Sequence, residues 1–185
     1  TSPPKTRPVH GRTTSRDELD TWFENDSPCM VIHGIAGIGK STLVADWVSS
    51  RMEEVPHLSV CWYPCQPWDK QVGLAVSLLH RFGVDDKHDP YQLMETLPMT
   101  PGAEFDVDSW RRRLLAYLTD AKAIRERFAG EAGGPPPYWL IILDDVHHVA
   151  DEARDLLGAL LDISKKSPLR LLFISRTTLN VYDRR

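Results

Sequence analysis

The sequence predicts an α/β fold with a mostly parallel sheet that is covered by helices on both faces. Short apolar segments of the kind that form buried strands recur at residues 29–33, 58–63, 138–143 and 169–175. Segments whose apolar residues have helical spacing separate them, and Gly or Pro stands at many of the boundaries. Strands that alternate with helices are joined by crossover connections, which place the strands parallel in one sheet.

Local signals support each element in turn. In chain order we expect a short helix starting near Ser15, a strand at 29–33 that is buried on both faces, a helix at 42–52, a strand at 58–63, a helix ending at Gly83, a short helix at 91–97, a loop at 98–105, a long helix at 108–128, a strand at 138–143, a helix at 151–164 and a strand at 169–175. Ser15 and Glu18 have the spacing of a capping box, which predicts the start of the first helix. Residues 130–137, GEAGGPPP, are predicted to form a loop because Pro removes backbone donors and Gly adds chain entropy.

Length, charge and cysteine usage limit the class of protein. The 185 residues suit one domain with a substantial core, and no apolar segment approaches the length that crosses a membrane. The net charge of -4 argues against a dedicated nucleic-acid binder, since such contact would require a local basic patch. The 3 cysteines lack disulfide-framework spacing and the start lacks a signal-peptide pattern, so we expect a reducing, cytoplasmic setting.

Residues 34–41, GIAGIGKS, match the pattern G-x-x-x-x-G-K-[ST] between a predicted strand and a predicted helix. Backbone N–H groups in such a loop hold phosphate oxygens, and the helix N-terminus adds positive potential. Lys40 is expected to reach the outer phosphates, and Ser41 is expected to ligate magnesium. The residues expected to bind the nucleotide here are Gly34, Ala36, Gly37, Ile38, Gly39, Lys40, Ser41 and Thr42. The alternative is a glycine-rich turn with an incidental lysine.

A second candidate site lies at the end of the apolar segment YWLIILDDVHH. Its strand is expected to deliver Asp144 and Asp145 to the carboxyl edge of the sheet, where open α/β sheets bind ligands. Asp144 is the expected magnesium carboxylate, and Asp145 is the candidate to orient or deprotonate an attacking water. The alternative is a pair of acidic residues that cap the following helix.

Four segments together resemble one family, the STAND class of P-loop ATPases, and within it the NB-ARC and NACHT-type modules of apoptotic and immune-receptor proteins. GIAGIGKST is similar to the NB-ARC phosphate loop, and LIILDDVHH to its strand ending in two aspartates. VHGR resembles the segment that helps to hold the adenine nucleotide, which implies contacts from Val9, Gly11 and Arg12. LRLLFISRT resembles the strand whose terminal arginine, here Arg176, senses the terminal phosphate.

This resemblance implies a three-layer P-loop NTPase fold and a switch controlled by Mg-ATP and ADP. In such a switch ADP holds a closed state, and ATP permits an open state that self-associates and presents other domains of the same parent chain. It implies slow ATP hydrolysis, with Lys40, Asp145 and Arg176 as the catalytic residues. Residues 1–13 are expected to form an extended lead-in and residues 14–185 the nucleotide-binding domain, a fragment without the family's helical and winged-helix subdomains.

Two alternative functions remain open. An AAA-type remodelling or initiator ATPase also has an arginine-bearing lead-in, a phosphate loop and a sensor strand, but it typically carries Asp-Glu where this chain carries Asp144 and Asp145. A non-hydrolysing scaffold would bind ADP as a structural ligand. Adenine is favoured over guanine because the chain contains no guanine-reading N-K-x-D segment.

Three further groups of residues are interpreted without a functional role. Cys61 and Cys65 lack a second Cys or His pair at zinc-finger spacing, so small buried thiols are a sufficient explanation. His147 and His148 are interpreted as loop histidines, with contact to a phosphate or water as the alternative. The arginines at 111–113 are interpreted as a solvated helix face, because consecutive helical residues point in different directions. The alternative is that they contact nucleic acid or a partner, together with Arg125 and Arg127.

Overall fold

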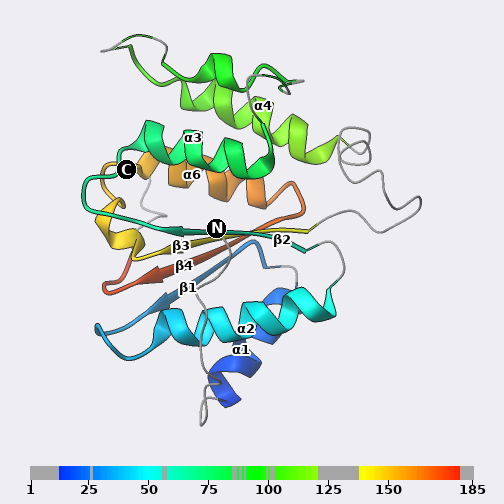
Figure 1. Ribbon diagram of the computed structural model, residues 1–185, viewed down its shortest axis with the longest axis vertical. Helices are drawn as coiled ribbons and strands as arrows, with labels where there is room; N and C mark the ends of the chain where they lie inside the picture. The colour runs from blue at the N-terminus through cyan, green and yellow to red at the C-terminus, as the bar shows by residue number, and fades with distance from the viewer. Residues whose placement is uncertain are drawn as a thin grey trace.

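A four-stranded parallel sheet forms the middle layer of the computed structural model, in the order β1-β4-β3-β2. The strands are β1 (Cys29–His33), β2 (Leu58–Pro64), β3 (Tyr138–Asp144) and β4 (Leu169–Ser175). The structure describes residues 13–25, 27–55, 58–84, 87, 89, 91–98, 100, 103–120 and 138–179. The predicted parallel sheet is confirmed, and all of its strands point toward the same edge (Figure 1).

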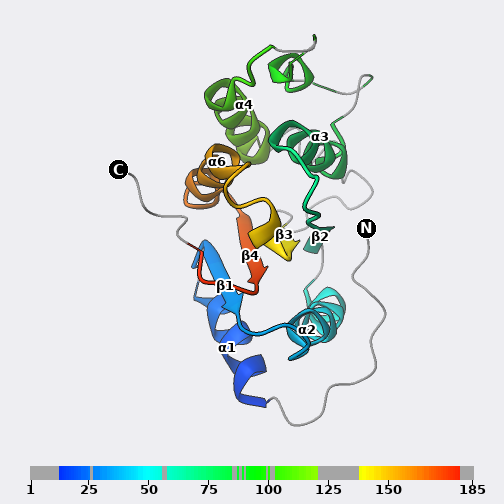
Figure 2. The same cartoon turned by 90° about the vertical axis from the view of Figure 1, so that its left-hand side faces the viewer.

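Helices cover both faces of the sheet, as Figures 1 and 2 show from two directions. One face carries α1 (Thr13–Glu24) and α2 (Lys40–Glu54), and the other carries α3 (Gln71–Phe82), α6 (Arg154–Ser164) and, packed on α6, α4 (Val107–Thr119). Two short 3-10 helices, η1 (Met94–Thr96) and η2 (Val146–His148), lie in the connections. The three-layer α/β arrangement is therefore as predicted.

The alternation of side chains along the central strands explains why these segments are apolar throughout. Leu140 and Ile142 of β3 belong to the buried cluster with α1 and α2, whereas Ile141 and Leu143 belong to the cluster with α3, α4 and α6. Successive strand residues point to opposite faces, and here both faces are covered. Burial on both sides thus accounts for a run without polar residues.

Two helix boundaries have a local chemical cause, and the one at Gly83 was predicted. Gly83 ends α3 in the left-handed conformation, at φ 76, which Gly adopts without the steric cost of a Cβ. Asp106 caps α4 by accepting a hydrogen bond of 2.9 Å from the Ser109 backbone N–H. The helix predicted at 108–128 ends at Thr119 in the described part of the chain, where Asp120 becomes extended. The remainder of that prediction and the loop predicted at 130–137 lie outside the described residues.

Several predicted details differ from the structure. The first helix already includes Thr13, so Ser15 lies inside α1 and is not the N-cap that the capping-box spacing predicted. The strand at Cys29–His33 is half-buried instead of buried on both faces, because within the described residues it pairs only with β4. The helix predicted at 91–97 is reduced to η1, since the Asp89 carboxylate accepts hydrogen bonds from the Leu93 and Met94 N–H groups in a local turn. Finally, α6 begins three residues later than predicted, at Arg154. No helix among the described residues combines the length and the apolar character needed to cross a membrane.

Candidate functional site

The parallel strands deliver three polar segments to one edge of the sheet. The loop at residues 34–39 follows β1 and leads into α2, Asp144 ends β3, and Arg176 follows β4. Since β4 lies between β1 and β3, these segments meet where the carboxyl ends of neighbouring strands meet. The structure thereby brings together Lys40, Ser41, Asp144, Asp145 and Arg176.

Two glycines in this loop have backbone conformations that L-residues rarely adopt. Gly37 has φ 78 and Gly39 has φ 83, both in the left-handed region. Gly39 is also the N-cap of α2, so the loop turns directly into the helix N-terminus. The backbone N–H groups at a helix N-terminus and the positive end of the helix dipole favour an anion at such a position.

Lys40 folds back over the loop instead of extending into solvent. Its Nζ donates hydrogen bonds to the Gly34 carbonyl at 2.7 Å and to the Ile35 carbonyl at 3.0 Å. The residue is only 9% exposed, and a buried ammonium requires such partners to offset its lost hydration. A positive charge is therefore held beside the loop amides, which fits a polyphosphate ligand.

Ser41 and Asp144 connect α2 to the end of β3. The Ser41 hydroxyl donates a hydrogen bond of 2.9 Å to Asp144 Oδ1, across 103 residues of chain. Burial raises the pKa of Asp144; the Ser41 hydrogen bond and the charge of Lys40 oppose this effect, whereas the charge of Asp145 adds to it. A hydroxyl beside a carboxylate fits Mg²⁺, which prefers oxygen ligands and completes its shell with phosphate oxygens and water.

Asp145 pairs with Arg176 next to the Ser41–Asp144 contact. Arg176 Nε lies 3.2 Å from Asp145 Oδ1, and Arg176 Nη2 lies 3.4 Å from Oδ2. Asp145 occupies the left-handed region at φ 54 and is the N-cap of η2, yet its side chain makes no capping hydrogen bond. The helix-capping alternative for these aspartates is therefore not supported, because their carboxylates bond to Ser41 and Arg176 instead.

His147 lies closer to this group than the interpretation as a loop histidine suggests. Its Nδ1 is 3.9 Å from Asp145 Oδ1, and its ring centroid is 4.2 Å from that of His148. Burial lowers the pKa of His147, as do the charges of His148, Arg176 and Lys40, while Asp145 opposes them. The consecutive residues D-D-V-H-H contained no signal for this proximity, which results from the turn of η2.

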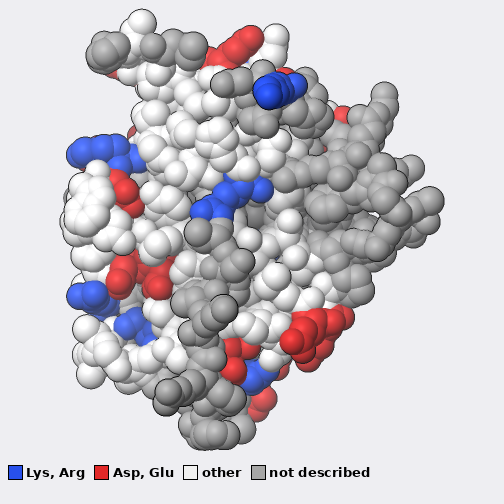
Figure 3. Space-filling model, in the orientation of Figure 1, with Lys and Arg blue, Asp and Glu red and all other residues white. Residues whose placement is uncertain are grey.

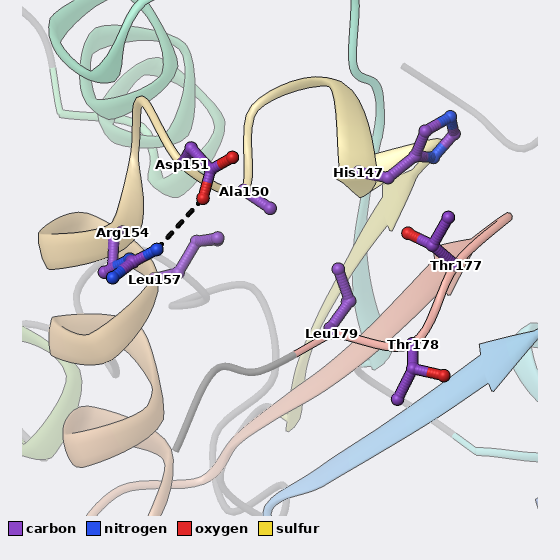
Figure 4. A pocket seen from close by; sticks show the side chains of 8 residues that line it. All are labelled: His147, Ala150, Asp151, Arg154, Leu157, Thr177, Thr178 and Leu179. Atoms are coloured by element: carbon purple, nitrogen blue, oxygen red, sulfur yellow. Dashed lines mark hydrogen bonds and ion pairs between the residues drawn. The ribbon is translucent and has the colours of Figure 1, made fainter. Parts of the chain in front are cut away.

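A cavity of about 240 Å³ adjoins the group and is distinct from the phosphate loop. It is lined by His147, Ala150, Asp151, Arg154, Leu157, Thr177, Thr178 and Leu179 (Figure 4). Asp151 and Arg154 form an ion pair of 3.0 Å on one side, while His147 and Thr177 lie on the other. None of its lining residues belongs to the loop at 34–41.

Some expected site residues are not part of this geometry. Val9, Gly11 and Arg12, expected to hold the adenine nucleotide, lie outside the described residues.

Cys61 and Cys65, for which no functional role was expected, are buried. The described residues contain no group of three or more His, Cys, Asp or Glu side chains placed to hold a metal ion.

A family model for the AAA ATPase domain matches residues 8–174. The chain belongs to this family. The match covers the loop at 34–41, the strand with its two aspartates and most of β4, so it includes Lys40, Ser41, Asp144 and Asp145 of the group described above but ends before Arg176. It supports the broader sequence-based assignment, a P-loop nucleotide-binding ATPase domain, and it favours the AAA-type alternative over the STAND, NB-ARC or NACHT interpretation.

Solved structures share the fold of this AAA ATPase domain at low sequence identity. Cdc6p from Pyrobaculum aerophilum matches with a TM-score of 0.62 and 14% identity, covering 96% of this chain and 43% of that chain. The ORC2 protein from Aeropyrum pernix, in ADPNP and ADP complexes, matches at 0.59 with 17% identity, covering 93% and 43%. The Aeropyrum pernix ORC1 protein, in complex with DNA, matches at 0.59 with 14% identity, covering 94% and 40%. The AAA ATPase domain thus spans less than half the length of these proteins.

Proposed function

We propose that this AAA ATPase domain binds ATP and ADP with magnesium at the carboxyl edge of its sheet, hydrolyses ATP, and serves as a nucleotide-dependent switch in a larger initiator-like protein. The observation that carries the proposal is the hydrogen bond between Ser41 and Asp144, formed beside a buried Lys40 at a helix N-terminus. It joins the two candidate sites, one for phosphate and one for magnesium, into a single site.

Each residue of the group has a proposed task. The loop amides and Lys40 hold the phosphate oxygens, and Ser41 and Asp144 hold the magnesium ion, which when bound neutralises part of the phosphate charge. Asp145 orients or deprotonates the attacking water, and Arg176 contacts the terminal phosphate. Positioning and electrostatic stabilisation supply most of the catalysis in phosphoryl transfer, so these side chains suffice for slow hydrolysis.

The base and the wider protein context are also proposed. Adenine is held in part by Val9, Gly11 and Arg12, as the family resemblance implies. The ATP state favours self-association and contact with other domains of the parent chain, which is the general way a terminal phosphate orders nearby segments.

Direct DNA binding by this domain is not part of the proposal, although the similar ORC1 protein is known in complex with DNA. The net charge is -4, and acidic and basic groups are interspersed on the face seen in Figure 3. Among the arginines at 111–113, Arg111 pairs with Asp108 and Asp162, and Arg113 pairs with Glu95. We therefore assign any DNA contact to other parts of the parent protein.

A STAND-type signalling or immune switch is the second candidate. It is favoured by one feature, Asp145 at the position where AAA-type ATPases typically carry Glu. Stimulation of ATP hydrolysis by DNA in the full-length parent protein would support the initiator-like function, and its absence would favour the signalling switch.

The binding experiment uses fluorescently labelled ATP and ADP, titrated with and without Mg²⁺. Wild type is expected to bind both nucleotides and to bind ATP more tightly with Mg²⁺, whereas Lys40→Ala is expected to lose at least tenfold in affinity, because a buried charge-assisted contact is removed. Lys70→Ala is the matched control, since Lys70 is an exposed lysine paired with Glu152. Equal, magnesium-independent binding by wild type and Lys40→Ala would refute the proposal.

Hydrolysis is tested separately from binding. In single-turnover assays, Asp145→Asn is expected to retain ATP binding and to release phosphate at least a hundredfold more slowly, because an amide does not accept the proton of water. Wild type that binds ATP without releasing phosphate would instead indicate the non-hydrolysing ADP-binding scaffold.

A further inference from the structure

The two groups assigned to the terminal phosphate and the attacking water are bonded to each other. Arg176 presents two nitrogens to the two carboxylate oxygens of Asp145, at 3.2 and 3.4 Å. This is the parallel, two-bond geometry in which a guanidinium recognises carboxylates and also phosphates. The same edge of the Arg176 guanidinium can therefore donate either to the carboxylate of Asp145 or to a phosphate.

The pair is also accessible enough to exchange partners. The side chain of Arg176 is 48% exposed and that of Asp145 is 37% exposed. Ion pairs at this level of exposure are weak, because water screens them and both side chains lose entropy when they are fixed. A phosphate dianion close to Arg176 can then compete with the carboxylate.

We propose that the terminal phosphate of a nucleoside triphosphate replaces Asp145 as the partner of Arg176, which makes Asp145 a specificity-determining residue for triphosphate over diphosphate. The inference rests on the proposed function, because it requires a nucleotide at the loop of residues 34–41. A diphosphate lacks the competing group and leaves the ion pair intact. A triphosphate must first break the pair, so Asp145 lowers the preference for triphosphate.

The exchange links recognition of the terminal phosphate to the availability of Asp145. While both carboxylate oxygens accept hydrogen bonds from Arg176, they are less able to accept one from water. Besides Arg176, Asp145 has His147 nearby, with Nδ1 at 3.9 Å from Oδ1. That Nδ1 is buried and makes no hydrogen bond among the described residues, so it is a candidate to position the released carboxylate.

The test is a double-mutant cycle on binding, independent of hydrolysis. Affinities for ADP and for the non-hydrolysable triphosphate ADPNP are measured with Mg²⁺ for wild type, Asp145→Asn, Arg176→Gln and the double variant. Asparagine tolerates the left-handed backbone that Asp145 adopts, so the fold of η2 is retained. In Asp145→Asn the preference for ADPNP over ADP is expected to rise about fivefold, the fold-change that corresponds to an exposed ion pair.

The Arg176→Gln background separates partner exchange from simple charge repulsion. Without Arg176, adding Asp145→Asn is expected to change the preference by less than about twofold, since no pair remains to be broken. If Asp145→Asn raises the preference for ADPNP equally with and without Arg176, the effect comes from repulsion between Asp145 and the phosphates. That result would overturn the inference. If Asp145→Asn binds both nucleotides with the same preference for ADPNP over ADP as wild type, the inference is overturned but the proposed function stands. Failure of wild type to bind either nucleotide would overturn the proposed function as well.

Discussion

Substitution of Asp20 by Ala is expected to loosen the packing of α1 against the helix that follows the phosphate loop. Asp20 Oδ1 accepts hydrogen bonds from Trp47 Nε1 at 2.6 Å, from Arg51 Nε at 3.1 Å and from Arg51 Nη2 at 2.5 Å. One carboxylate oxygen thus joins two residues of α2 to α1. The pKa of Asp20 is lowered: burial raises it, but the hydrogen bonds from Arg51 and Trp47 outweigh that effect.

The expected loss of stability can be worked from these contacts. Trp47 is 1% exposed, so its indole N–H would remain buried without an acceptor, which costs about 1–3 kcal/mol. Arg51 keeps Glu24 and Glu54 as partners, at 3.4 and 3.2 Å, so loss of its closest carboxylate adds only about 0.5 kcal/mol. The free energy of unfolding should therefore fall by about 1.5–3.5 kcal/mol.

Urea unfolding followed by tryptophan fluorescence measures this change. With a slope of about 2 kcal/mol/M, the midpoint should fall by about 0.8–1.8 M. Asp20→Asn keeps an acceptor for Trp47 and should lose about 1 kcal/mol, while Glu18→Ala, at an exposed position of the same helix, should stay within about 0.5 kcal/mol of wild type. If Asp20→Ala matches Glu18→Ala, the contact does not hold the two helices together and the reasoning fails.

Further predictions concern two glycines and the buried thiols. Gly37→Ala should destabilise the protein by about 1–2 kcal/mol through its positive φ of 78 alone, because a Cβ there would meet no atom within 4 Å. Gly73→Ala, in the first turn of α3 and equally open, should instead stabilise it by about 0.5 kcal/mol. Urea midpoints of the two variants that move in the same direction would contradict this contrast. Burial raises the pKa of the Cys61 thiol to about 12 and also raises that of Cys65, so unfolding should release protons above pH 9 and stability should fall as the pH rises beyond that value. Ellman's reagent at pH 8 should accordingly react slowly with the folded protein and quickly in denaturant, and rapid reaction of the folded protein would show that these thiols are accessible.

Local patterns were sufficient for most of the fold because the relevant signals are short in range. The segment at Leu169–Ser175 is apolar at nearly every position, and a strand covered on both faces requires this pattern whatever its neighbours are. Gly83 ended a helix as expected, since a left-handed residue is required there. The pattern failed at 91–97, where one carboxylate, Asp89, binds two backbone N–H groups and replaces the expected helix with a turn.

Local sequence patterns could not predict that the phosphate loop and the two aspartates lie side by side, because this depends on the order of the strands in the sheet. Sequence motifs separately indicated a phosphate loop and a pair of aspartates, and their chemistry follows from residue type and spacing. That β4 lies between β1 and β3 is a property of the assembled sheet. Only this order brings Ser41 to Asp144 and Arg176 to Asp145, over separations of 103 and 31 residues.

The sequence by itself thus determined the class of fold, the strand–loop–helix unit around Lys40 and the type of ligand that such a unit accepts. Tertiary structure alone decided which acidic residue contacts which partner, Asp144 with Ser41 and Asp145 with Arg176. The physical reason is that backbone conformation and amphipathic spacing are set by neighbours along the chain, whereas contacts between side chains are set by the packing of elements that are distant in sequence.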